Sequence, residues 1–133
     1  MATRKTRSLQ QGCVAFAKNK KRVSAFDQRT LGLAVQDSES THDLLLGSTY
    51  EVVVHSIPRK HAASIKIARP VEPREQMPIK PTVVVENLEA VRRSAKETGG
   101  HLKPIEQAWH FRGCVVLDGW DPERNVVQFK QPE

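Results

Sequence analysis

The chain has 133 residues, of which 38% are hydrophobic and 27% are charged, and its formal net charge is +6. This composition is typical of a globular protein with one domain, or with two very small units that share a core. No apolar run approaches the roughly 20 residues that a membrane-spanning helix requires, and no apolar segment follows the basic N-terminus as it does in a signal peptide. We therefore predict neither a membrane partner nor secretion.

The positive charge is concentrated at the N-terminus. Residues 1–31 contain eight lysines and arginines but one acidic residue, Asp27, whereas the rest of the chain is close to neutral. A basic arm over residues 1–11 is compatible with nucleic-acid binding. No recognition motif and no interleaved aromatic residues accompany it, so we favour a solvated arm over a nucleic-acid partner.

The two cysteines, Cys13 and Cys114, lack the spacing of a CxxC redox motif or of a metal site. This usage is typical of reduced thiols in a reducing compartment, so we predict a cytoplasmic protein.

The first half of the chain predicts the order β-α-β-β-β. Residues 12–18 alternate in polarity as a strand does, and residues 20–31 follow a helical period that ends at Gly32. Residues 33–57 then contain three strands separated by turns. We assign residues 12–57 to a first module.

Residues 58–78 break this regularity with four prolines and frequent charges, and they predict a linker that also covers part of the core. From residue 79 to residue 131 the earlier order repeats. A strand at 82–86 precedes a helix at 88–98, which begins after Asn87 and ends at Gly99 and Gly100.

Three strands complete this second module: a short one at His101 and Leu102, a longer one over residues 109–117, and a closing one after Asn125. Asp-Gly and Asp-Pro favour turns, so the stretch from Asp118 to Arg124 predicts a tight turn before the closing strand. If the backbone at Arg124 takes a positive φ, we expect a strain of roughly 1 kcal/mol.

Three segments resemble one protein family. Residues 25–33 (AFDQRTLGL) resemble the end of the first helix in the glyoxalase/bleomycin-resistance/dioxygenase proteins, the vicinal oxygen chelate superfamily. Residues 87–100 are similar to the helix of that family's second module, and residues 121–129 (DPERNVVQF) to its closing strand. The resemblance implies an α+β fold in which two β-α-β-β-β modules form a cupped mixed sheet with the helices outside. It also implies that the cup is the ligand site and that the protein forms a homodimer.

In metal-dependent members of that superfamily, four His, Gln or Glu side chains in the cup hold the ion. The resemblance places Gly12, Glu51, Lys80 and Gln128 at these positions. Gly12 offers no ligand and Lys80 brings a positive charge, so two ligands remain, and one of them is neutral. We predict that the cup binds no metal and requires no cofactor.

Polar residues of the cup are the first candidates for function. Glu51 and His55 are the candidate catalytic bases, and Lys80 and Gln128 are candidate ligand-binding residues. We expect Lys80 to form an ion pair with Glu51 at the vacant metal position. The alternative for each residue is a structural or solvated polar group.

Aromatic residues of the second module are the next candidates. Trp109 and Phe111 alternate on one face of a strand and are candidate apolar walls of the ligand site, with core packing under the linker as the alternative. Trp120 falls in the predicted turn, where it would serve as a lid or an interface residue.

We favour metal-independent binding of a small amphipathic molecule in the cup. The first alternative is an enzyme, a glyoxalase-like lyase or isomerase or a dioxygenase-type enzyme, that uses Glu51 or His55. Such an enzyme would bind a metal only if the four positions are assigned one or two residues out of register. The second alternative is a binding module that uses the basic arm.

Overall fold

The computed structural model describes residues 10–133, so all but the last two residues of the predicted basic arm lie outside the described part. The first module is a four-stranded sheet with one helix, in the strand order β1-β4-β3-β2. β1 and β4 are parallel and the other pairs are antiparallel. Its elements are β1 (Gln11–Ala17), α1 (Lys20–Leu31), β2 (Ala34–Ser38), β3 (His42–Leu46) and β4 (Tyr50–Ser56).

The second module repeats this arrangement with the strand order β5-β9-β8-β6. β5 and β9 are parallel, and the second strand of the module is divided into β6 and β7, which both pair with β8. The predicted α+β class with paired β-α-β-β-β modules is confirmed. The elements are β5 (Thr82–Val84), α3 (Leu88–Glu97), β6 (His101–Leu102), a 3₁₀ turn (Ile105–Gln107), β7 (Trp109–Phe111), β8 (Cys114–Trp120) and β9 (Val126–Pro132).

Local sequence signals explain the limits of the two helices. The Asn19 side chain accepts a hydrogen bond from the Arg22 amide at the start of α1, and Gly32 ends α1 with φ of 66°. The Asn87 side chain accepts from the Ala90 amide at the start of α3. Val23 of α1 packs toward the first sheet, and Val91 and Ala95 of α3 pack toward the second. None of the helices within residues 10–133 is long and apolar enough to cross a membrane.

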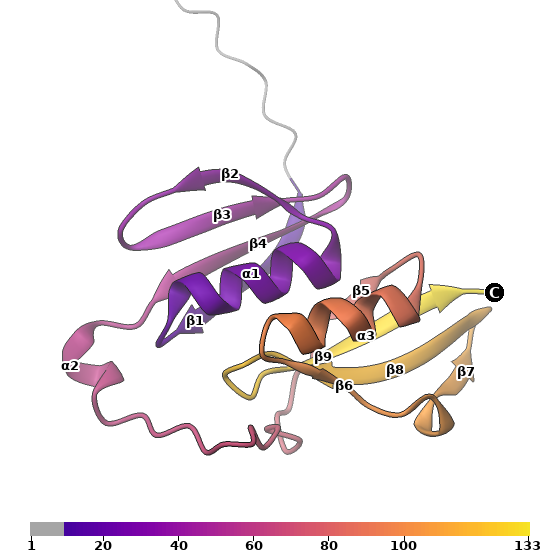
Figure 1. Cartoon of the computed structure of the whole chain (residues 1–133). Helices are drawn as coiled ribbons and strands as arrows, with labels where there is room; N and C mark the ends of the chain where they lie inside the picture. The colour runs from indigo at the N-terminus through magenta and orange to yellow at the C-terminus, as the bar shows by residue number, and fades with distance from the viewer. Residues whose placement is uncertain (1–9) are drawn as a thin grey trace, which may run out of the picture.

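The modules lie side by side, with α1 and α3 packed against each other on the same side of both sheets (Figure 1). Phe26 of α1 is fully buried and belongs to the apolar core of the second module, beside Leu88 and Phe129. Glu123 of the second module accepts hydrogen bonds from the Lys18 and Asn19 amides, both at 2.6 Å. The two halves therefore share a core and an interface.

The structure corrects two details of the second module. Arg112 and Gly113 have φ of 50° and 76° and form a hairpin turn, so the single strand predicted over residues 109–117 is two strands, β7 and β8. Residues 118–120 belong to β8, and the turn comes later, where the Asp121 amide donates to the Asn125 carbonyl. Trp120 therefore ends a strand and is not in a turn, because ladder pairing with β6 and β9 overrides the turn preference of Asp-Gly.

The linker between β4 and β5 contains one short helix, α2 (Arg59–Ala62), and otherwise runs as an irregular chain from the end of the first sheet to the second module (Figure 1). Arg124 fixes its middle: Nε of Arg124 donates to the Glu72 carbonyl at 2.9 Å, and the Arg74 amide donates to the Arg124 carbonyl at 2.9 Å. The φ of Arg124 is 79°, so this contact is made from a backbone conformation that costs a non-glycine residue about 1 kcal/mol.

Candidate functional site

Each sheet has one face covered by its helix and one face turned away from it, which we call the open face. Val52 and Val54 pack with Val23 of α1, so the intervening residues of β4 point to the open face, as their alternation predicts. Phe129 packs with Val91 of α3, which places the alternate positions of β9 on the open face of the second module.

Lys80, Asp118 and Gln128 form a polar cluster on the open face of the second module. Nζ of Lys80 lies 2.7 Å from Oδ2 of Asp118, and Nε2 of Gln128 donates to Oδ1 of Asp118 at 3.4 Å. Asp118 is 7% exposed, so Lys80 neutralises a carboxylate that has little contact with water. The predicted Lys80–Glu51 pair is therefore wrong: the partner of Lys80 is Asp118, a residue that we had assigned to a turn.

Trp109 and Phe111 lie on the same open face. Trp109 is the cross-strand partner of Val116, which in turn pairs with Lys130 of β9. The ammonium group of Lys130 lies 5.6 Å from the centre of the Phe111 ring, within reach of a cation–π interaction. Both aromatic side chains remain exposed, Trp109 by 40% and Phe111 by 51%, so they are available to a ligand.

Glu51 and His55 lie on the open face of the first module, four residues apart along β4. The Glu51 carboxylate has no ion-pair or hydrogen-bond partner in the described part of the chain. His55 stacks on His42 with ring centres 6.3 Å apart and contacts the Phe16 ring at 5.6 Å. Nδ1 of His55 lies 2.8 Å from the Ser56 carbonyl, an acceptor, so Nδ1 carries a proton and the neutral ring has its lone pair on Nε2.

The four positions that the family resemblance assigns to a metal do not suit a divalent cation in this chain. Lys80 occupies one of them and is already paired with Asp118. Gly12 occupies another, and a Cβ at this position would lie 1.7 Å from the Glu51 carbonyl oxygen, so no residue with a side chain fits there. Glu51 and Gln128 alone give one charged and one neutral donor, fewer than such an ion requires. Nowhere in residues 10–133 do three or more His, Cys, Asp or Glu side chains gather as a metal site would require.

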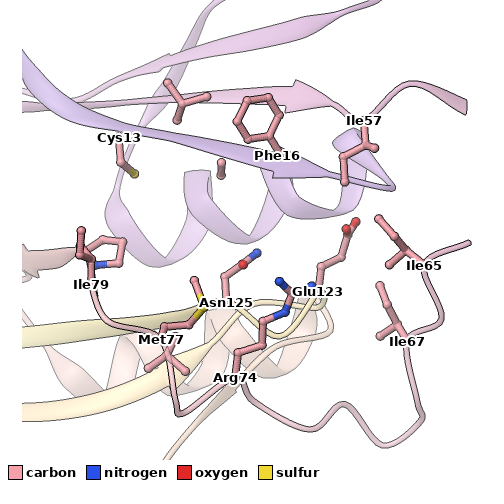
Figure 2. Close-up of a pocket in the computed structure, with 14 residues that line it drawn as sticks. Cys13, Phe16, Ile57, Ile65, Ile67, Arg74, Met77, Ile79, Glu123 and Asn125 are labelled. Carbon is pink, nitrogen blue, oxygen red and sulfur yellow. The ribbon is translucent and has the colours of Figure 1, made fainter. Parts of the chain in front are cut away.

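A cavity of about 460 Å³ lies at the seam between the modules, between β1, the start of β9 and the linker (Figure 2). A volume of this size suits a small organic molecule. The cavity is mainly apolar, and the side chains that make it so come from three segments of the chain: Val14 and Phe16 of β1, Val126 of β9, and Ile65, Ile67 and Met77 of the linker.

The polar groups of this cavity are few and lie on one side. Arg74 extends from the linker toward Glu123 and Asn125 (Figure 2). The two carboxylate oxygens of Glu123 already accept the Lys18 and Asn19 backbone amides, and the Asn125 side-chain amide donates to Oδ2 of Asp121 at 2.8 Å. The Arg74 guanidinium has no carboxylate partner among residues 10–133 and is left as the available donor.

None of the six predicted site residues lines this cavity. Three residues next to them do line it: Phe16, which contacts His55, and Ile79 and Pro81, which flank Lys80 in the sequence. Sequence reasoning missed the contribution of the linker. The alternating pair Ile65 and Ile67 is the one local signal that an apolar wall could have been placed there.

No family model matches the chain, and no curated protein matches it at a significant level. Solved structures do resemble it. A glyoxalase/bleomycin resistance protein/dioxygenase family enzyme from Burkholderia phytofirmans PsJN superposes with a TM-score of 0.65 at 16% sequence identity, over 92% of this chain and 98% of that one. The chain has the glyoxalase/bleomycin-resistance fold.

Two further structures support this fold. A glyoxalase/bleomycin resistance protein from Albidiferax ferrireducens T118 gives a TM-score of 0.62 at 12% identity, over 95% of this chain and all of that one. The fosfomycin resistance protein FosX from Mesorhizobium loti gives 0.62 at 8% identity, over 97% of this chain and 95% of that one. At such low identity, the glyoxalase/bleomycin-resistance fold alone is shared, and the function depends on the residues described above.

Proposed function

We propose that this protein binds a small amphipathic molecule, without a metal, in the cavity between β1, β9 and the linker. The observation that carries this proposal is the cavity itself: about 460 Å³, lined mainly by apolar side chains, with Arg74 as a polar group free to orient a ligand. Such a lining combines apolar burial of the ligand body with one directional contact.

The fold supports the same proposal. The resemblance to the glyoxalase/bleomycin-resistance proteins implies a ligand site formed by both modules, and the apolar residues of β1 and β9 line one cavity together with the linker here. The exposed Trp109 and Phe111, together with Lys80 and Gln128, would extend the binding surface along the open face of the second module.

Fluorescence titration with the neutral probe N-phenyl-1-naphthylamine tests the proposal. We expect saturable binding with one probe per chain. Met77→Glu places a charge in the cavity wall and should weaken binding at least about tenfold. Ile105→Glu makes a similar change at an exposed apolar residue outside the cavity and should leave binding unchanged. Absence of saturable binding, or binding that survives Met77→Glu, would contradict the proposal.

An enzyme that uses His55 as a general base is the second candidate. The free lone pair on Nε2 and the contact with Phe16 at the edge of the cavity favour it. A base next to a bound carbonyl compound removes the proton from the carbon beside the carbonyl, and in D₂O the returned proton is a deuteron.

Proton NMR in D₂O with a panel of small carbonyl compounds therefore tests this candidate. We expect catalysed exchange that His55→Asn abolishes while probe binding remains, and Glu51→Gln provides the same test for Glu51. Exchange no faster than in buffer would leave binding as the proposed function.

A further inference from the structure

A second cavity, of about 480 Å³, adjoins the first at the N-terminus of α1. The two share Ile67 and Glu123, so a molecule in the first cavity that extends past Ile67 enters the second. The second cavity is mainly polar, and four of the residues that line it are basic: Lys18, Lys20, Arg22 and Arg69.

Two of these basic groups are engaged by the protein. Nζ of Lys20 pairs with Asp43 at 2.7 Å, and Nζ of Lys18 donates to the Ile65 carbonyl at 2.7 Å. Arg22 and Arg69 have no carboxylate at ion-pair distance within the described chain, and neither does Arg74 of the first cavity. Three arginines without acidic partners thus border the two cavities.

Glu123 is the acidic group between them, and its charge is compensated locally. Each of its oxygens accepts a backbone amide, Lys18 or Asn19, at 2.6 Å, and these amides lie at the positive end of the α1 dipole. The side chain is 7% exposed. The lining of the two cavities therefore combines three arginines with one carboxylate whose lone pairs are directed toward α1.

We propose that the two cavities form one site for an amphipathic anion. The apolar body lies among the side chains of β1 and the linker, and a carboxylate, sulfonate or phosphonate head group lies near Ile67, where the two cavities adjoin, and contacts Arg74 of the first cavity and Arg69 of the second. A guanidinium group binds such an oxyanion with two parallel hydrogen bonds, which a neutral head group cannot replace. This inference rests on the proposed function and adds the chemical class of the ligand.

The backbone around Arg74 is already fixed for this role. The Arg74 amide donates to the Arg124 carbonyl, and the Arg124 side chain donates to the Glu72 carbonyl, so the linker is bound on both sides of residue 73. A head group that contacts Arg74 therefore meets a main chain that needs no ordering on binding.

A pair of probes with the same ring system separates the two proposals. 8-Anilinonaphthalene-1-sulfonate carries a sulfonate that N-phenyl-1-naphthylamine lacks. We expect the anionic probe to bind the wild-type protein at least about tenfold more tightly than the neutral probe. Raising NaCl from about 50 mM to about 500 mM should weaken the anionic probe alone.

The double variant Arg69→Gln/Arg74→Gln should weaken the anionic probe at least about tenfold and change the neutral probe by less than about twofold. Arg93→Gln/Lys96→Gln removes the same two positive charges from the exposed face of α3 and should change neither. If the neutral probe binds and the double variant leaves the anionic probe unchanged, the anion assignment is wrong and the proposed function stands. If neither probe binds the wild-type protein, both proposals are wrong.

Discussion

Asp27 of α1 and Asp121, the residue that follows β8, are carboxyl groups from different modules that border the same small cavity, of about 40 Å³. Asp27 is 5% exposed and Asp121 is 3% exposed. Asp121 accepts hydrogen bonds from the Glu123 and Asn125 backbone amides, at 2.8 and 3.0 Å, whereas no donor in residues 10–133 bonds to the Asp27 carboxyl. Burial, and secondarily the charge of Asp121, raises the pKa of Asp27 well above its ordinary value of 3.8.

This pKa gives stability a defined pH dependence. The folded state holds the Asp27 proton more tightly than the unfolded state does. Protonated Asp27 therefore contributes its full share to the free energy of unfolding below pH 3.8, and this contribution is lost as the pH rises through the raised pKa of the folded state. Asp27→Asn is neutral at every pH. We expect it to raise the free energy of unfolding by about 1–3 kcal/mol at about pH 7.5 and by much less at about pH 4.5.

Urea denaturation at the two pH values measures this difference, and Asp37→Asn on the exposed strand β2 is the matched control. Equal destabilisation by Asp27→Asn at both pH values would mean that Asp27 is ionised and has a partner in the fold.

Glu123 connects the second module to the first helix through two charge-assisted hydrogen bonds, to the Lys18 and Asn19 amides. Glu123→Gln keeps one acceptor oxygen but loses the other and the negative charge at the helix N-terminus. We expect a loss of about 1.5–3 kcal/mol in the free energy of unfolding. Glu106→Gln, at an exposed position in the 3₁₀ turn, should change stability by less than about 0.5 kcal/mol. Similar values for the two variants would contradict the capping role.

Arg124 combines a strained backbone with a contact to the linker. Arg124→Ala loses the hydrogen bond to the Glu72 carbonyl and keeps the strain of a φ of 79°. Arg124→Gly loses the same hydrogen bond and removes the strain. We expect the glycine variant to be about 1 kcal/mol more stable than the alanine variant, measured by thermal or urea denaturation. An alanine variant at least as stable as the glycine variant would show that the positive φ carries no cost here.

A double-mutant cycle tests the partner of Lys80. Lys80→Met leaves Asp118 buried with the long contact to Gln128 alone, so we expect a loss of about 1–2 kcal/mol in the free energy of unfolding. The cycle with Asp118→Asn should give a coupling energy of about 0.5–2 kcal/mol, and the cycle with Glu51→Gln should give none. Coupling to Glu51 in place of Asp118 would support the pairing predicted from the sequence.

The order of the elements could be predicted because its signals are local. The Asn19 and Asn87 caps, the Gly32 terminus and the alternation along β4 each depend on a few neighbouring residues. Asp118 shows the limit of such signals, because Asp-Gly is a common turn sequence and only pairing with two neighbouring strands makes it part of β8.

The candidate site was harder to predict, because it is made by tertiary contacts of a segment without periodicity. Met77 and Arg74 reach the cavity because Arg124 fixes the linker, and that contact joins residues about 50 positions apart in the sequence. Strand alternation predicts that Trp109 and Phe111 share one face of their strand, but it does not indicate which part of a face is hollow.

The buried position of Phe26 determines how the protein responds to cleavage of its backbone in the linker. Its ring is fully buried in the core of the second module, and that module is therefore incomplete without the first helix. Scission of the linker near Ala63 would produce two fragments that each lack part of their packing and that fold only as a complex. Co-expressed as separate polypeptides, they should reassemble by fragment complementation, and Phe26→Ala should prevent the reassembly.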